Sequence, residues 1–196
     1  MKKNTKKIVT AAGIAAGTDA VASLYAYVTI KALIDTALDR EMPKVMEKAD
    51  KRISGEKSSD EFTNRMESAS ESLAVQPNET VEIIAHDGEK LVGHYFPCEK
   101  PERVIIAFHG WRSSWHRDFG MISDFWYKNN CSVLYVEQRG QNNSSGEYMG
   151  FGLTERFDCL DWLNWEIERC GSDIPVYLAG VSMGATTVLM AAGLQL

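Results

Sequence analysis

The sequence has little of what nucleic-acid or metal binding requires. Its 196 residues include 21 Lys and Arg against 27 Asp and Glu, which gives a formal net charge of −6. This balance leaves no basic surface to neutralise phosphates, so we expect no nucleic-acid partner. The cysteines form no C-x-x-C pair and have no histidine at ligand spacing, so we expect no bound metal. They are interpreted as separate thiols in or near the core: Cys98, Cys131, Cys159 and Cys170.

A glycine-rich phosphate loop is also missing. Gly150-Phe151-Gly152 lacks the third glycine of a dinucleotide-binding motif, so the sequence predicts no cofactor. Hydrophobic residues make up 44% of the chain, which is enough for a buried core, and the length allows one domain and a tail.

Long apolar runs are scarce, and the exception lies near the N-terminus. Four lysines in residues 2–7 precede Ile8–Ile30, a stretch of 23 residues with a single charge, Asp19. As a helix this stretch would be about 35 Å long, enough to cross a bilayer. Its apolar side chains favour insertion by roughly 2–4 kcal/mol, against about 2.5–3.5 kcal/mol for an Asp at the membrane centre, so insertion is marginal.

Three interpretations of residues 1–34 therefore stay open. They are a signal anchor, a cleaved signal peptide with Ala20-Val21-Ala22 as a candidate cleavage site, and a soluble or surface-lying helix. For an anchor, the lysine cluster would stay inside and the rest of the chain would lie outside the cytoplasm. A secreted and a cytoplasmic location are the alternatives.

Residues 35–76 are charged and helix-prone, and we expect them to link the N-terminal segment to a folded domain. Two groups of apolar residues recur at helical spacing: Met42, Val45, Met46 and Ala49, then Phe62, Met66, Ala69 and Leu73. Charges of both signs are mixed along the region, which favours a solvated helical stalk or a brace lying against the domain.

Residues 77–196 predict an α/β domain. Two strand-like runs, 80–85 and 91–96, flank His86-Asp87-Gly88, and Asp-Gly is a strong hairpin signal. Apolar runs at 103–108, 132–136 and 176–179 predict strands buried in a parallel sheet, with helices between and after them. The helix at 115–129 would bury Phe119, Ile122, Phe125 and Trp126, and the helix at 154–170 would bury Phe157, Leu160, Leu163 and Ile167. This order favours a mostly parallel sheet behind an N-terminal β-hairpin.

The strongest chemical signal is the turn Gly180-Val181-Ser182-Met183-Gly184, which lies between the last predicted strand and a helix of small residues. A strand can enter a helix this abruptly only through strained backbone angles, and the two glycines leave room where a Cβ would press on strand or helix. Ser182 would then project from the sheet at a helix N-terminus, where backbone N–H groups favour developing negative charge. The alternative is a buried turn serine without chemistry.

Two further loops follow buried strands, where reactive groups gather in parallel sheets. The first begins with His109-Gly110-Trp111. The second is residues 137–146, which is similar to a D-x-R-G-x-G-x-S pattern, with Glu137 in place of Asp and Asn142 in place of the middle glycine. Together with the G-x-S-x-G turn, these loops resemble the α/β-hydrolase superfamily over about residues 77–196, and most of all its bacterial membrane-anchored, serine-aminopeptidase-like members.

The resemblance implies roles for individual residues. Ser182 would be the nucleophile, and the backbone N–H groups of Trp111 and Met183 would form the oxyanion hole, which would leave both side chains free to shape the acyl pocket. His109 invites a general-base role, but in the superfamily the base comes later in the chain, so His109 with Gly110 would hold the loop. Arg139 would be a strut between loops. His86, His94 and His116 are weaker candidates.

A complete triad is missing from the sequence. In the superfamily an acid and then a histidine follow the serine, and the fourteen residues after Ser182 contain neither. We therefore expect the chain to be the N-terminal part of a longer hydrolase, truncated after the helix that follows the G-x-S-x-G turn (the nucleophile elbow), and inactive or nearly so as it stands. The expected reaction is cleavage of a small-molecule acyl ester or thioester, or of a peptide, through an acyl-enzyme. A non-catalytic, membrane-tethered binding protein on the same fold is the alternative.

Overall fold

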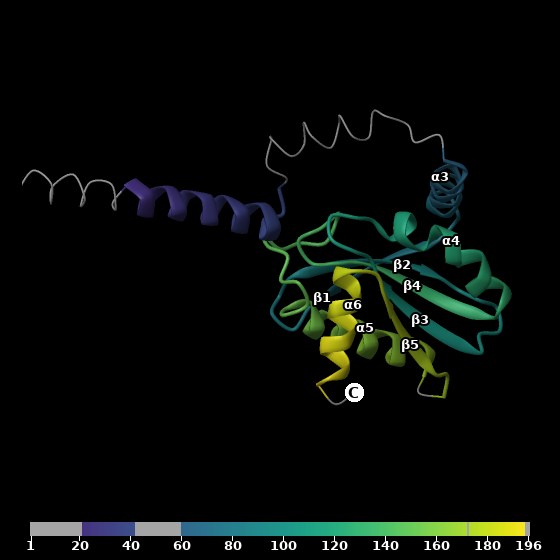
Figure 1. Ribbon diagram of the computed structural model, residues 1–196. Helices are drawn as coiled ribbons and strands as arrows, with labels where there is room; N and C mark the ends of the chain where they lie inside the picture. Colours follow the sequence, from purple (N-terminus) through teal and green to yellow (C-terminus); the bar gives the residue numbers. More distant parts are fainter. Residues whose placement is uncertain (1–20, 42–59, 172, 195–196) are drawn as a thin grey trace, which may run out of the picture.

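A computed structural model describes residues 21–41, 60–171 and 173–194, and within these ranges it forms a five-stranded sheet covered by helices on both faces (Figure 1). The strands are β1 Glu79–Ile84, β2 Lys90–Phe96, β3 Arg103–Phe108, β4 Cys131–Glu137 and β5 Val176–Gly180. The labelled helices are α3 Glu61–Ala74, α4 Trp115–Lys128, α5 Glu155–Cys170 and α6 Met183–Ala192.

The sheet is mixed, in the order β1-β2-β4-β3-β5. β1 and β2 form the predicted antiparallel hairpin, and β2 pairs antiparallel with β4. β3 pairs parallel with β4 on one side and with β5 on the other. The predicted parallel strands therefore lie side by side with their carboxyl ends at one edge, and β5 lies at the outer edge of the described sheet.

Alternate residues of β3 and β4 enter two separate cores, as the two-residue period of a strand requires. Ile106 and Leu134 pack with Trp162 of α5 and Ala191 of α6. Ile105 packs on the opposite face with Trp115 and Phe119 of α4. The near-continuous apolar runs of β3 and β4 are explained because both faces of these strands are covered.

The predicted buried faces of α4 and α5 are partly wrong. Phe119 is buried, but Phe125 is 60% exposed, because six residues along a helix turn it by about 120° away from Phe119. In α5 the face that meets the sheet carries Cys159, Trp162 and Glu166, roughly 120° from the predicted apolar stripe, and Ile167 is 40% exposed. Counting only apolar residues misplaced this face, since it also holds three buried carboxylates.

The helix α3 lies against α4 as a brace, one of the two arrangements predicted for this region. Leu73 is 1% exposed and joins the core beside Trp115 and Phe119. The Ser70 hydroxyl forms a 2.9 Å hydrogen bond with Nδ1 of His116 on α4. The other predicted group, Met42 to Ala49, lies outside the described residues.

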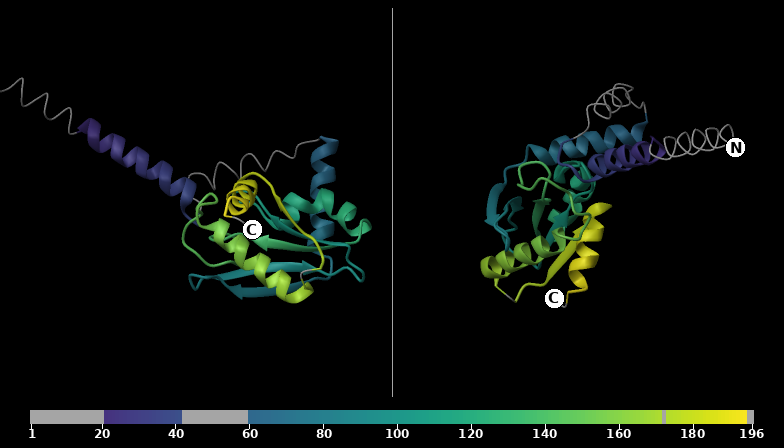
Figure 2. Two further views of the ribbon diagram at one scale, coloured as in Figure 1. Left: turned by 90° about the horizontal axis from the view of Figure 1, so that it is seen from below. Right: turned by 90° about the vertical axis from the view of Figure 1, so that its left-hand side faces the viewer.

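The N-terminal helix, Val21–Leu38, projects from the domain, and its last turn meets loops of the domain (Figures 1 and 2). It is long and apolar enough to cross a membrane, although a signal sequence would pass the same test. The first part of the predicted run, residues 8–20, lies outside the described residues. The helix continues eight residues beyond Ile30, where the apolar run of the sequence ends. In this added part, Lys31 and Asp35 form a 2.7 Å ion pair one turn apart.

We expect Leu73→Ala to lower the free energy of unfolding by about 2–5 kcal/mol, because it leaves a cavity between α3, α4 and the sheet. The matched control is Phe62→Ala on the same helix, which removes a 58% exposed side chain and should change stability by less than about 0.5 kcal/mol. Urea unfolding at equilibrium measures both values, and equal effects would mean that α3 does not pack on the domain.

Candidate functional site

The turn between β5 and α6 has the strained geometry expected of a strand that enters a helix directly. Ser182 is the N-cap of α6, with φ 52° and ψ −115°, and it is exposed. A positive φ is rare for a residue with a Cβ, and such strain is found where the surrounding structure enforces it. The hydroxyl of Ser182 is thereby presented to solvent at the first turn of a helix.

Two close backbone approaches enforce this turn. A Cβ on Gly184 would lie 1.9 Å from the carbonyl oxygen of Phe108, at the end of β3. A Cβ on Gly180 would lie 2.3 Å from the carbonyl oxygen of Gly184. Both distances are far inside van der Waals contact, so the first turn of α6 can sit on the sheet only with glycine at these positions.

The loop after β3 lies directly beside the serine. A Cβ on Gly110 would be 3.4 Å from the Cβ of Ser182. The loop is held by Asp118 of α4, whose carboxylate accepts 2.6 Å hydrogen bonds from the Gly110 N–H and from the Ser113 hydroxyl. Among the described residues, no acceptor binds the backbone N–H of Trp111 or of Met183. These two N–H groups belong to the residue after Gly110 and to the residue after Ser182.

His109 is fully buried at the end of β3 and both of its ring nitrogens are engaged. Nδ1 lies 2.8 Å from the carbonyl oxygen of Gly110, which can only accept, so Nδ1 carries the proton. Nε2 then accepts from the Gln138 N–H at 3.2 Å and from the Asn142 amide at 3.2 Å. Burial lowers the pKa of His109, which keeps the ring neutral. His109 has no free nitrogen with which to take a proton from Ser182.

Gln138 connects this histidine to α6, the helix that begins after Ser182. Its side-chain amide donates to the His109 carbonyl, and its side-chain oxygen accepts a 2.7 Å hydrogen bond from Thr187 on α6. Gln138 and Thr187 are both buried. Buried hydrogen bonds therefore link α6 to the residues that follow β3 and β4, and each polar group named here has a partner.

The remaining histidines are also engaged away from Ser182. His86 forms a 2.9 Å pair with Asp161, His94 lies 2.8 Å from Glu137, and His116 contacts Ser70 and Ser114. The sequence has four histidines, and none of them forms a hydrogen bond with Ser182. The described chain thus presents a serine and free N–H groups without a histidine base.

Arg139 ties the hairpin turn to α5. Its guanidinium donates to both carboxylate oxygens of Asp158, at 2.9 Å from Nε, and to Asp87 at 2.6 Å. The side chains of Arg139 and Asp158 are only 8% and 4% exposed, so the pair is buried. These interactions raise the pKa of Arg139, which remains charged, and the loop after β4 is fixed to two other segments.

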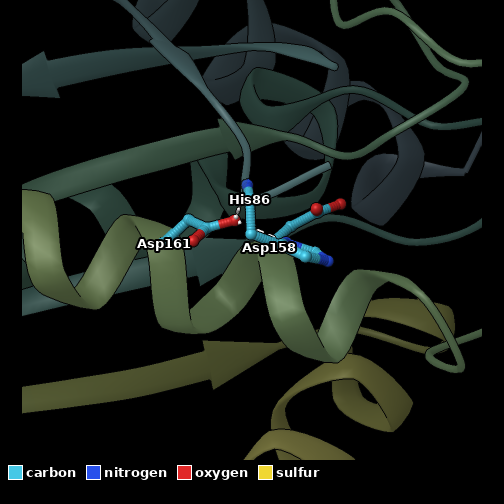
Figure 3. Close-up of side chains that lie close together, drawn as sticks. All are labelled: His86, Asp158 and Asp161. Atoms are coloured by element: carbon cyan, nitrogen blue, oxygen red, sulfur yellow. Dashed lines mark hydrogen bonds and ion pairs between the residues drawn. The ribbon is translucent and has the colours of Figure 1, made fainter. Parts of the chain in front are cut away.

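Asp158 of this pair also lies close to His86 and Asp161, and three such groups could in principle ligate a cation (Figure 3). However, both oxygens of Asp158 already accept from the Arg139 guanidinium, and the Asp161 carboxylate accepts from the His86 backbone at 3.0 Å. A cation here would face a fixed positive charge, so we assign no metal to the cluster.

The side chains of Trp111 and Met183 were expected to be free to shape the acyl pocket, and this stays a prediction. The Trp111 indole N–H donates to the carbonyl oxygen of Ala37 at 3.0 Å, and Met183 is 3% exposed. The contact between Trp111 and Ala37 was not anticipated, because the domain was considered apart from residues 21–41.

Sequence reasoning missed Asp118, Gln138 and Thr187 as parts of this site. Asp118 lies on α4, eight residues after the glycine that it binds, and no motif links the two. Gln138 and Thr187 are 49 residues apart. Only Gln138 carried a signal, since it lies within the recognised loop after β4.

We expect Gly184→Ala to destabilise the protein by roughly 3 kcal/mol or more, because a methyl group cannot fit against the Phe108 carbonyl. Gly193→Ala, at the other end of α6, is the matched control: its new Cβ would have ordinary contacts, with the nearest atom 3.4 Å away. Thermal unfolding of both variants measures the difference, and a stable Gly184→Ala protein would contradict the described turn.

In the unfolded chain we expect His109 to titrate near the ordinary histidine pKa of 6.5. In the folded protein its pKa is lowered by burial, so the ring should stay neutral at a lower pH. A pKa that is lowered on folding contributes stability above 6.5, and this contribution is lost as the pH falls. Ring ¹⁵N NMR between pH 8 and pH 5 measures the protonation, with the urea-unfolded chain as control. The same titration midpoint in both states would contradict the buried ring.

No model of a protein family matches the sequence, and no curated protein matches it. Solved structures do match. An esterase from Pyrococcus furiosus has a TM-score of 0.53 and 26% identity, over 60% of this chain and 46% of the esterase. A serine hydrolase without a lid from Xanthomonas campestris has a TM-score of 0.53 and 19% identity, over 61% of this chain and 57% of the other.

The protein Est1E of Butyrivibrio proteoclasticus, solved with ferulic acid, has a TM-score of 0.51 and 21% identity, over 59% of this chain and 47% of the other. This chain thus spans about half the length of the solved structures it matches. The described domain has the α/β-hydrolase fold.

Proposed function

We propose that this protein is a serine hydrolase whose nucleophile is Ser182. The observation that carries the proposal is an exposed serine at positive φ, at the N-terminus of α6 and in contact with the loop after β3. Esters, thioesters and peptides are the proposed substrate class, and the esterase among the similar structures favours a small acyl ester. The catalytic domain comprises residues 77–196.

In the proposed reaction the Ser182 oxygen attacks the acyl carbonyl carbon and loses its proton to a base. The carbonyl oxygen becomes an oxyanion that accepts hydrogen bonds from the Trp111 and Met183 N–H groups. Removal of one such donor typically costs about 3–4 kcal/mol of transition-state stabilisation. The intermediate collapses to an acyl-serine as the protonated leaving group departs, and water then releases the acid.

The supporting residues act by holding the two loops and the helix in place. Gly180 and Gly184 permit the strained turn, and Gly110 allows the loop after β3 to touch Ser182. His109 is proposed as a structural residue, because its two ring nitrogens bind backbone and side-chain groups of this loop and the next. Arg139 is the strut that anchors the second loop.

A base is the component that the described residues do not supply, because all four histidines are engaged elsewhere. Without a base within hydrogen-bond reach, serine attacks slowly, but an intact oxyanion hole retains some catalysis. We therefore propose that this 196-residue chain acylates slowly.

The N-terminal helix is proposed as a membrane anchor that holds the domain outside the cytoplasm, as in serine-aminopeptidase-like hydrolases. Its support is the apolar, unburied helix Val21–Leu38 and the four lysines that precede it in the sequence. A cleaved signal peptide, and with it a secreted protein, and a cytoplasmic location remain the alternatives.

The second candidate function is a non-catalytic, membrane-tethered binding protein that keeps the hydrolase fold. The engagement of every histidine in structural contacts is the specific observation that favours it. Under this alternative the acyl-like ligand would bind beside Ser182 without covalent chemistry.

The two candidates differ in their reaction with a fluorophosphonate, which phosphonylates an activated serine. A serine hydrolase lacking its base should show slow, time-dependent labelling of the wild-type chain and none in Ser182→Ala. Ser68→Ala, an exposed serine on α3, is the matched control and should label at the wild-type rate. Intact-protein mass spectrometry measures the labelled fraction over hours. Absence of any Ser182-dependent labelling would refute the hydrolase and leave the binding protein.

A further inference from the structure

The last turn of the N-terminal helix and the three residues after it are bound to the domain through an unbroken row of backbone carbonyls. The six carbonyl oxygens of residues 36–41 all accept hydrogen bonds from the domain. Arg112 donates to those of Thr36, Asp39, Arg40 and Glu41 at 2.7–3.3 Å. The Trp111 indole donates to Ala37 at 3.0 Å, and the Met149 N–H donates to Leu38 at 2.7 Å.

This arrangement has a physical cause in the helix itself. The last four carbonyls of a helix have no partner within the helix, and they carry the negative end of its dipole. A guanidinium has five N–H donors in a fixed fork and is therefore suited to several carbonyls at once. Arg112 caps the helix in this way from a left-handed backbone position, with φ 48°.

The contact is reciprocal. The Arg40 guanidinium donates to the carbonyl oxygens of Asn142 and Ser144, each at 2.6 Å, and of Gly146 at 3.4 Å. The Arg40 N–H donates to Glu147 at 2.8 Å, and Asp39 forms a β-bridge with Tyr148. Each side thus gives one arginine to the backbone of the other, and the view in Figure 1 shows the helix ending on these loops.

Of the two loops that receive the helix end, the loop after β3 lies beside Ser182 and the loop after β4 contacts that first loop. Trp111 and Arg112 directly follow Gly110, where an added Cβ would lie 3.4 Å from the Cβ of Ser182. Asn142 also holds the loop after β3, because its amide donates to His109 and to the Ser113 carbonyl at 3.1 Å. A displacement of residues 36–41 would therefore release both loops and the proposed oxyanion donor on Trp111.

We propose that residues 36–41 form part of the Ser182 site, with Arg40 and Arg112 as positioning residues that couple the N-terminal helix to the loops of that site. The proposal rests on the proposed function of Ser182, since it concerns the geometry of the same site. It means that the segment N-terminal to the domain is required for the arrangement of the site as well as for location.

The test compares Arg112→Ala, Arg112→Lys and Arg40→Ala with a matched control, Lys31→Ala, in the full chain in detergent micelles. Lys31 lies on the same helix, and within the described ranges its one ion pair is with Asp35, also on the helix. Amide hydrogen exchange by mass spectrometry reports on residues 110–113 and 142–149, independently of any reaction. We expect exchange there to rise about tenfold or more in both alanine variants, less in Arg112→Lys, and not in Lys31→Ala.

The second measurement is the fluorophosphonate labelling rate of Ser182 at saturating probe. A shift of about 1 Å at a reacting group can cost on the order of 100-fold, so we expect the saturating rate of the alanine variants to fall at least about tenfold. Arg112→Lys should recover part of this rate, because lysine keeps the charge and reaches fewer carbonyls. Thermal unfolding of each variant confirms that the domain is folded.

The outcomes separate this proposal from the one on which it rests. Unchanged exchange in both alanine variants overturns the coupling, whatever the labelling shows. Increased exchange with an unchanged labelling rate overturns the role of Arg40 and Arg112 at the site and leaves the hydrolase intact. A wild-type chain that never labels refutes the hydrolase, and the exchange data alone then decide whether the helix end holds the loops.

Discussion

The approach of the α6 N-terminus to the end of β3 is the constraint on which the candidate site depends. The Val181 N–H donates to the Phe108 carbonyl at 3.0 Å, and Gly184 sits against that same oxygen without room for a side chain. This contact forces Ser182 into its positive φ and places it beside Gly110, the second residue after β3. The serine is therefore positioned by backbone contacts that tolerate very little change.

Buried polar contacts also hold the loop after β4, which is connected to the loop beside Ser182. Glu137 ends β4, and burial alone would raise the pKa of its carboxyl, but hydrogen bonds from His94 and Asn143 outweigh burial and lower it. The ionised carboxylate thus serves as a fixed acceptor that shapes the loop after β4. A charged group in the interior is stable here because each of its oxygens has a donor.

The parts of the fold that were predictable from sequence are those set by local pattern. A few consecutive residues are enough to predict each of these parts: the strands β3 and β4, the Asp-Gly hairpin and the G-x-S-x-G turn. The reason is that strand burial, turn geometry and steric room are local properties. The faces of α4 and α5 were predicted less well. In α5 the buried Asp158 is stabilised by Arg139, nineteen residues away, and apolar periodicity contains no information on such a partner.

Long-range polar contacts of the site were not predictable for the same reason. Asp118 binds the loop after β3 from the next helix, and Arg112 binds carbonyls more than seventy residues earlier in the chain. These contacts depend on backbone groups, which every residue offers, so no residue type marks them. The partition of the chain into an anchor, a linker and a domain likewise gave no sign that residues 36–41 contact the loops.

The position of β5 in the described sheet bears on local unfolding next to Ser182. β5 pairs only with β3 in the described sheet, and the surface around it leaves large side chains in water, with Tyr177 56% and Leu189 73% exposed. Segments with few buried apolar neighbours undergo local unfolding at a lower free energy than the central strands do. Ser182, the proposed nucleophile, therefore follows an edge strand of the described sheet, whereas β2, β3 and β4 each pair with a strand on both sides.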